Sequence, residues 1–180
     1  MKKFFSNRGA WFGFITGGLA ITVLFVGAGG ALSYTNSMEF CISCHEMEQG
    51  PYQELQKTLH YNNRNGVRVE CPDCHVPENN PAYLMAKLRA WKDVAHHWLG
   101  TIDTPEKFEA HRLEMAERVW AKMEASGSRE CHSCHSFDAM VLEEQGRRGR
   151  KKHPLAIEEG KTCIECHKGV AHSLPKGYEY

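Results

Sequence analysis

Four copies of one short motif contain every cysteine of the chain. The motifs are Cys41-Ile42-Ser43-Cys44-His45, Cys71-Pro72-Asp73-Cys74-His75, Cys131-His132-Ser133-Cys134-His135 and Cys163-Ile164-Glu165-Cys166-His167. In each motif, two residues separate a pair of thiols and a histidine follows the second thiol. At this spacing the two thiols can add to the vinyl groups of a haem while the histidine reaches the iron. The sequence therefore predicts four covalently bound haem c groups.

Other uses of paired cysteines explain this pattern less well. Four thiolates can hold a zinc ion, but zinc gives no reason for a histidine after every second cysteine. A thioredoxin-like redox pair needs one such motif within a βαβ pattern, and the sequence contains no such pattern of strands. Disulfides are common in secreted proteins, yet they leave the histidines unexplained. A tetrahaem c-type cytochrome is the interpretation that accounts for all four motifs.

Each predicted iron also needs a second axial ligand. The motif histidines, expected as the proximal ligands, are His45, His75, His135 and His167. Outside the motifs, His60 and His153 each lie between two successive motifs, and His172 closely follows the fourth. We expect these three as distal ligands, with an ordinary polar surface role as the alternative.

The remaining histidines are expected on a solvated surface. His96, His97 and His111 lie on predicted helices among charged residues, and His132 is confined between the cysteines of its own motif. One haem is then left without an obvious distal histidine. Met47, two residues beyond His45, is the other soft ligand placed next to a motif.

The N-terminal segment predicts a membrane anchor. Residues 1–8 carry three positive charges, and residues 9–38 carry no charge. The apolar run 10–32 is long enough to cross a bilayer core of about 30 Å as a helix. The basic residues place 1–9 in the cytoplasm and 33–180 on the periplasmic side of the bacterial inner membrane. A cleaved signal peptide is the alternative, but its apolar region is usually only about 7–15 residues long.

The rest of the chain predicts a small, mainly α domain with almost no strand. The motifs are separated by 30, 60 and 32 residues, which favours two dihaem halves with an insert between them. Four haems in one short domain must supply much of its apolar interior. Residues 33–180 contain 19 basic and 22 acidic residues, so nucleic acid is not an expected partner. An acidic surface around the exit haem would require a basic docking face on the partner.

Two helices are predicted in the insert. Asn79 or Asn80 can cap the first, Pro81 suits its first position and Gly100 ends it. The stripe expected to be buried comprises Leu84, Leu88, Trp91, Ala95 and Trp98. Thr104 and Pro105 begin the second, and Gly127 stops it. Five residues of this second helix lie on one face, namely Phe108, Arg112, Met115, Val119 and Met123. Residues 145–152 are basic, contain two glycines and are expected to form a solvated loop.

These motifs resemble the NapC/NirT/NrfH family of membrane-anchored quinol dehydrogenases. The similar segments are the N-terminal anchor and residues 40–47, 71–77, 87–100, 100–108 and 161–172, and the NapC/NirT branch is the most similar. The resemblance implies a one-helix protein that oxidises menaquinol or ubiquinol and passes electrons through four haems to a periplasmic reductase in nitrate or nitrite respiration. In NrfH-like members the methionine two residues after the first motif binds the first iron, so His45 or Met47 is expected there.

The resemblance also implies a quinol site that includes Lys87 and Asp93. Quinol oxidation releases two electrons and two protons, so a proton acceptor such as Asp93 makes chemical sense, and Lys87 can bind a quinol oxygen. Both are otherwise ordinary surface charges. Tyr83, Trp91 and Trp98 on the same helix suit a lipid interface, or a core packed against haem. An electron relay without a quinol site is the main alternative, and a terminal reductase is a third.

Overall fold

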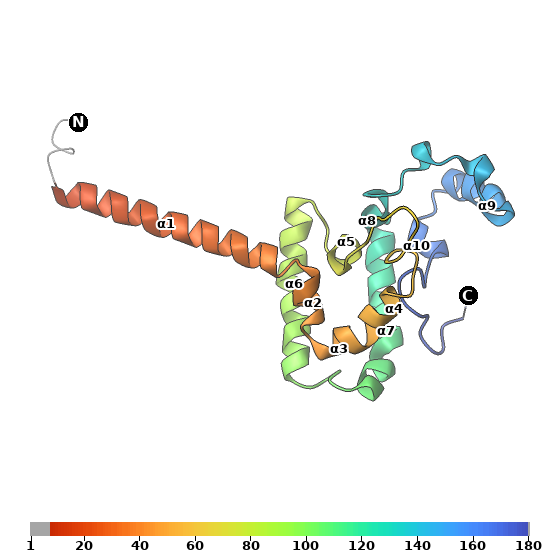
Figure 1. Cartoon of the computed structure of the whole chain (residues 1–180), viewed down its shortest axis with the longest axis horizontal. Helices are drawn as coiled ribbons and strands as arrows, with labels where there is room; N and C mark the ends of the chain where they lie inside the picture. Colours follow the sequence, from red (N-terminus) through yellow and green to blue (C-terminus); the bar gives the residue numbers. More distant parts are fainter. Residues whose placement is uncertain (1–7, 180) are drawn as a thin grey trace.

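The anchor forms one long exposed helix that projects from a helical domain. The computed structural model describes residues 8–179, and within them α1 (Arg8–Tyr34) is the only segment outside this domain (Figure 1). Residues 9–34 are long and apolar enough to cross a membrane, and none of this span is buried in protein. Lys2 and Lys3, on which the expected orientation partly depends, lie outside the described residues. Residues 8–179 thus contain one candidate membrane-spanning helix.

Two helices from the insert frame the domain. Helix α6 (Asn80–Trp98) begins after its N-cap Asn79, and α7 (Pro105–Ala125) begins after Thr104, whose hydroxyl accepts a hydrogen bond from Lys107 N. Gly100 and Gly127 follow the two helices with φ of +62° and +67°, a backbone conformation that glycine adopts without strain. The two helices run antiparallel, with short helical segments between them (Figure 1). Their predicted starts and stops are confirmed.

The haem motifs lie on short helical turns. The helices that carry motif residues are α2 (Met38–Ile42), α3 (His45–Met47), α5 (Cys71–His75), α8 (Arg129–His132) and α10 (Cys163–Cys166). The segments that connect them include η1 (Glu48–Tyr52), α4 (Gln53–Leu55), η2 (Phe137–Ala139), η3 (Leu142–Glu144) and the longer α9 (Arg147–Glu158). Helix α5 contacts both α2 and α8, and α10 contacts α7. The described residues contain no strand, so the prediction of a mainly α fold is confirmed.

The domain has a very small apolar interior made by protein alone. Apart from three prolines, only Met38, Leu55 and Ile164 among the described hydrophobic side chains are less than a tenth exposed. A domain of this length normally buries many more apolar side chains. The expected face of α7, from Phe108 to Met123, is half-buried. This sparse interior agrees with the prediction that haem supplies apolar surface.

Two sequence-based expectations are wrong. The stripe of α6 expected to be buried faces outward, with Leu88 and Trp91 each 65% exposed and Trp98 71% exposed. The helical period was correct, but periodicity does not reveal whether an apolar face meets protein or another apolar medium. Residues 145–152, expected as a loop, lead into α9, where Gly146 is the N-cap. Arginine and lysine are good helix formers, and they outweigh a glycine in the first turn.

Candidate haem centres

Every motif histidine lies beside a second histidine from elsewhere in the chain. The four pairs, with their ring-centre separations, are His45–His97 at 5.9 Å, His75–His172 at 6.2 Å, His60–His135 at 6.2 Å and His153–His167 at 5.9 Å. A metal–imidazole bond is about 2 Å long, so two rings on opposite sides of one ion have centres roughly 6 Å apart. Each pair therefore has the spacing that could hold one iron between two imidazoles.

The pairs connect the two halves of the domain. His60, from the first half, faces His135 of the third motif, and His172, at the end of the second half, faces His75. His153 pairs within its own half. The first and second pairs of motifs therefore form interlocked halves rather than two independent units.

His97 is the candidate ligand that sequence reasoning missed. It was expected on a solvated face, but α6 carries it to His45, 52 residues earlier in the chain. The one available signal was the number of ligands, because four irons need four distal ligands and the sequence offered only three clear candidates. The neighbouring His96 instead lies 3.2 Å from the hydroxyl of Thr101, His111 is exposed on α7, and His132 is exposed. Met47 takes part in none of the four histidine pairs that the described residues form.

Burial keeps several of these imidazoles in their neutral form. Desolvation, helped by the neighbouring His172, lowers the pKa of His75 to about 4. Desolvation also lowers the pKa values of His60, His167 and His172. The neutral imidazole has the free lone pair that binds a metal. At neutral pH the protein environment thus prepares these side chains for ligation.

The motifs follow one another in space in the order in which they occur in the chain. Cys41 of the first motif is in hydrogen-bonding contact with Cys71 of the second. Cys74 of the second lies close enough to Cys134 of the third for their charges to interact. Cys131 of the third contacts Cys163 of the fourth. Each candidate haem site therefore adjoins the next one in the chain.

Ser128 holds the third and fourth motifs together. It is completely buried, and its φ of +55° lies in the left-handed region that non-glycine residues rarely adopt. Its hydroxyl accepts a hydrogen bond from the backbone N–H of Ile164, inside the fourth motif, at 3.1 Å. No simple sequence signal marks this serine, because its role depends on a contact 36 residues away.

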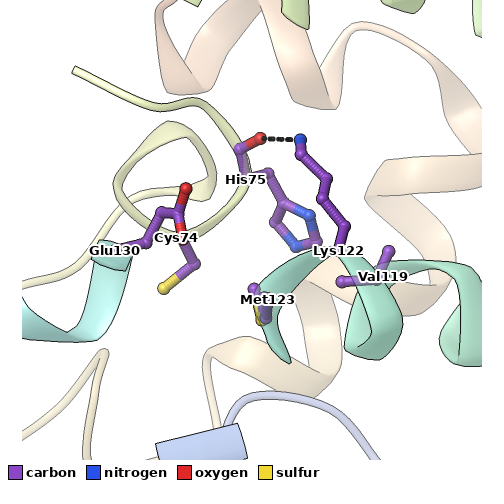
Figure 2. Close-up of a pocket in the computed structure, with 6 residues that line it drawn as sticks. All are labelled: Cys74, His75, Val119, Lys122, Met123 and Glu130. Carbon is purple, nitrogen blue, oxygen red and sulfur yellow. Dashed lines mark hydrogen bonds between the residues drawn. The ribbon is translucent and has the colours of Figure 1, made fainter. Parts of the chain in front are cut away.

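A cavity lies beside the second motif, between α5 and α7. Figure 2 shows its lining residues, which are Cys74, His75, Val119, Lys122, Met123 and Glu130. Lys122 Nζ donates a hydrogen bond to the carbonyl oxygen of His75 at 3.3 Å, while the thiol and imidazole extend away from that bond (Figure 2). The cavity thus combines a motif thiol, a motif imidazole and apolar helix residues.

The first histidine pair shares a buried carboxylate. Glu46 Oε1 accepts a hydrogen bond from His97 Nδ1 at 2.6 Å, and Oε2 lies 3.3 Å from His45 Nδ1. The Glu46 side chain is only 2% exposed, and no lysine or arginine of the described residues pairs with it. Because a carboxylate only accepts, His97 carries its proton on Nδ1 and leaves Nε2 available for iron. Cys44 completes this cluster, which belongs to the first haem site.

In the fourth pair, a neutral side-chain amide accepts the proton of the non-motif histidine. Gln145 Oε1 accepts a hydrogen bond from His153 Nδ1 at 2.5 Å. Gly149 leaves room for this glutamine, since a Cβ there would come within 2.9 Å of Gln145 Oε1. The proton again occupies Nδ1, and Nε2 remains available.

Lys87 and Asp93 have different surroundings on α6. Lys87 Nζ donates to the carbonyl oxygen of Thr35, just after α1, at 2.8 Å, and desolvation lowers its pKa. Asp93 is accessible to solvent, but nearby protein atoms displace enough water to raise its pKa, and the charge of Arg118 on α7 only partly opposes this. The groups that act on Lys87 and those that act on Asp93 do not include the other residue. Lys87 therefore faces the anchor, whereas Asp93 is influenced by α7.

The donor set fits covalent haem. All eight cysteines are free thiols, each motif has a paired imidazole, and the protein interior is sparse. Free thiols also count against the disulfide interpretation. An anchoring helix, a mainly α domain and four such sites define a membrane-anchored multihaem c-type cytochrome.

Comparison with known proteins identifies the family. The model of the NapC/NirT cytochrome c family, N-terminal region, matches residues 5–177, and the chain belongs to this family. The denitrification system component NirT of Stutzerimonas stutzeri is 51% identical over 91% of this chain and 81% of its own length. NapC of Escherichia coli K12 is 51% identical, over 78% and 70% respectively. TorY of Escherichia coli O157:H7 is 49% identical over 84% of this chain, but the match covers only 43% of TorY. No solved structure matches the chain.

Proposed function

We propose that this protein oxidises membrane quinol and delivers the electrons to a periplasmic reductase. Family membership supports quinol-linked electron transfer at the membrane. The observation that carries the proposal is the position of α6, which joins the anchor to the first histidine pair. Tyr83 Oη donates to the carbonyl oxygen of Leu32 at 3.0 Å, and His97 at the other end of α6 lies beside His45. A lipid-soluble donor could therefore reach the first haem site from the bilayer.

The exposed apolar face of α6 fits the same arrangement. Leu84, Leu88, Trp91 and Trp98 are all more than half exposed. Helix α6 lies across the end of α1 in Figure 1, as expected for a helix that rests on the membrane surface. Tryptophan is enriched at this level of the bilayer. In this arrangement 10–32 spans the inner membrane, 1–9 is cytoplasmic and 33–180 is periplasmic.

The proposed quinol site uses Lys87 and Asp93, two residues of α6 that lie between the anchor and His97. Lys87 uses one of its three N–H groups on Thr35, which leaves two to bind a quinol oxygen. Asp93, whose pKa is raised, is the proposed proton acceptor, because a base titrating nearer to neutrality takes up a proton more readily. The two side chains have different roles in this proposal: Lys87 binds the quinol, and Asp93 accepts its proton.

The proposed iron ligands follow from the paired histidines. His75, His135 and His167 are the proximal ligands, and His172, His60 and His153 are their respective distal ligands. His45 and His97 are the proposed pair at the first haem, with Met47 as the alternative to His45. Bound haem iron accepts and releases single electrons, which connects a two-electron donor to a reductase.

A relay without a quinol site is the second candidate function. A first site closed by His45 and His97 would favour the relay, because no face of the iron would remain open. A quinol can also donate an electron at the edge of a haem, so a closed iron does not exclude quinol oxidation. The two functions therefore have to be separated by kinetics.

The test is stopped-flow reduction of the detergent-held holoprotein by a reduced quinol analogue. Rapid haem reduction in wild type, strongly slowed in Asp93→Asn while dithionite still reduces all haems, supports the proposal. Asp138→Asn is the matched control, because Asp138 is an exposed aspartate on η2, beyond the third motif. If no quinol reduces the wild-type protein, the relay replaces the dehydrogenase. Normal rates in Asp93→Asn would remove this residue from the mechanism.

A further inference from the structure

Helix α9 carries a dense positive charge that nearby acids neutralise only in small part. The exposed basic residues in its first two turns are Arg147, Arg148, Arg150, Lys151 and Lys152. In the described part of the chain, none of the five forms an ion pair. Glu159, just beyond the helix, pairs with Lys161 instead. The cluster therefore faces solvent, and only the charge of Glu159, which Lys152 also feels, offsets a small part of it.

Helix stability does not explain this cluster. The N-terminus of a helix is the positive end of its dipole, so basic side chains there are disfavoured, and the first turn of α9 has no acid to compensate. Arg147 and Lys151 are four residues apart, as are Arg148 and Lys152, so each pair of like charges meets on one face and repels. The positive charge destabilises its own helix, and an acidic partner would relieve the repulsion.

The rest of the domain has the opposite charge. Outside this cluster, residues 33–180 contain 14 basic and 22 acidic residues. An acidic partner would be attracted to α9 and repelled by most other surfaces, which favours one orientation of approach. This reverses the sequence-based expectation that an acidic exit surface would require a basic partner.

The charge lies next to the fourth histidine pair. Helix α9 itself contributes His153, whose ring centre is 5.9 Å from that of His167. Figure 1 shows α9 at the end of the molecule opposite α1. Anionic lipid headgroups at the membrane that α1 enters would therefore be at the wrong end of the domain to neutralise it.

We propose that the basic cluster of α9 is the docking surface for the electron acceptor, a periplasmic redox protein with carboxylates around its own redox centre. The inference rests on the proposed function, because it assumes that electrons leave the chain towards a periplasmic protein. The short path from His153 to the protein surface makes docking on α9 productive for electron transfer.

The experiment measures electron transfer out of the protein separately from electron entry. Full-length holoprotein in discs of neutral phosphatidylcholine is reduced with dithionite and mixed with oxidised plastocyanin, an acidic blue-copper protein used as the probe. One electron passes from the reduced protein to each Cu(II), and loss of the copper absorbance gives the rate. The cationic complex hexaammineruthenium(III) is the acceptor of opposite charge.

Two variants remove the same charge from opposite ends. At low ionic strength, Arg148→Gln/Lys152→Gln is expected to slow plastocyanin reduction about three- to tenfold, and added salt reduces this difference. The rate with hexaammineruthenium(III) should not fall. The control Arg89→Gln/Lys92→Gln neutralises two exposed charges on α6 and should leave the plastocyanin rate unchanged. Equal slowing in both variants, or none in the α9 variant, would overturn the docking surface.

Two further outcomes separate the remaining explanations. If the difference between wild type and the α9 variant disappears in discs containing anionic phosphatidylglycerol, lipid headgroups occupy α9 and the protein-docking proposal is wrong. Reduction by the quinol analogue is measured in the same discs. If the quinol analogue does not reduce the protein but the α9 variant still slows plastocyanin reduction, quinol oxidation alone is refuted. If the quinol analogue reduces the protein but the α9 variant does not slow plastocyanin reduction, the docking surface alone is refuted.

Discussion

The first and fourth histidine pairs differ in the group that holds the non-motif imidazole. At the first pair, the buried carboxylate of Glu46 accepts the proton of His97 Nδ1. At the fourth, the neutral amide of Gln145 accepts that of His153. A carboxylate makes an imidazole a stronger electron donor than an amide does, and stronger donation stabilises oxidised iron. We therefore expect a lower reduction potential at the membrane end than at the far end.

The protein surfaces around the first and fourth histidine pairs also differ. Helix α6, which carries His97, exposes an apolar face that includes Trp91 and Trp98. Helix α9, which carries His153, exposes basic side chains. One end suits a lipid-soluble electron donor and the other suits an acidic protein acceptor. The domain thus has two chemically different ends, which the chain's formal net charge of zero does not reveal.

Removing the second imidazole should have the largest effect at either end. His97→Ala should convert one haem to the high-spin state and His153→Ala another, as measured by electron paramagnetic resonance. Only His97→Ala should also impair reduction by quinol, because His153 lies at the exit end. Met47→Leu is the companion variant. A new high-spin signal in Met47→Leu would assign the first iron to the methionine in place of His45, whereas an unchanged spectrum in His97→Ala would remove His97 from the ligands.

The pH dependence of quinol oxidation tests the entry end. The pKa of Asp93 is raised mainly by desolvation, so the carboxyl stays protonated to a higher pH than an ordinary aspartate. A protonated carboxyl cannot accept a proton, and kcat/KM should therefore fall as pH decreases through this raised pKa, by up to about tenfold per pH unit. The acidic limb should be lost in Asp93→Asn and kept in Asp138→Asn. A limb that persists in Asp93→Asn would point to another base.

Exchanging the two hydrogen-bond acceptors should reduce the contrast in potential. Glu46→Gln should raise the potential of the first haem, and Gln145→Glu should lower that of the fourth, each by an amount on the order of tens of millivolts. Spectroelectrochemical titration of the holoprotein measures both shifts. Glu48→Gln, which neutralises an exposed carboxylate two residues from Glu46, is the control. Shifts of the same sign in both test variants would refute the comparison.

Glu54 provides a carboxylate whose main role is structural, so its loss should have the smallest functional effect. It accepts hydrogen bonds from Arg112 Nη2 at 2.5 Å and from Ser173 N at 3.0 Å, tying α4 to α7 and the C-terminal segment. Glu54→Gln should lower the free energy of unfolding by about 1–3 kcal/mol at pH 7. Denaturation followed by haem absorbance measures the loss. Because Glu54 Oε2 lies 3.8 Å from Nδ1 of His172, beyond hydrogen-bond distance, the potential of the second haem should rise only slightly.

The pH dependence of this stabilisation has a defined sign. Desolvation opposes ionisation of Glu54, but the hydrogen bond from Arg112 and the Ser173 N–H outweigh it and lower the pKa below 4.5. The stabilisation is therefore complete above the ordinary glutamate pKa and is lost as pH falls through the lowered value. The difference between wild type and Glu54→Gln should shrink over that range. A constant difference would mean that the ion pair does not cause it.

The fold was largely predictable where local chemistry decides it. Asn79 and Thr104 as N-caps, with Gly100 after α6, defined helix ends because capping involves only neighbouring residues. The direction of an apolar face was not predictable in this way. The α6 stripe around Leu88 and Trp91 has the same period whether it packs on protein or lies against lipid, so only the tertiary structure could show that it is exposed.

The spacing of the motifs determined by itself that this chain belongs among multihaem cytochromes, because cysteine and histidine positions within five residues specify covalent attachment locally. Tertiary structure decided which histidine faces which. His60 reaches the third motif and His97 the first through packing between helices that are distant in the chain. Tertiary structure also decided where the positive charge of α9 lies. The sequence gives the charges of this segment, but only folding places α9 at the end of the molecule opposite the anchor (Figure 1).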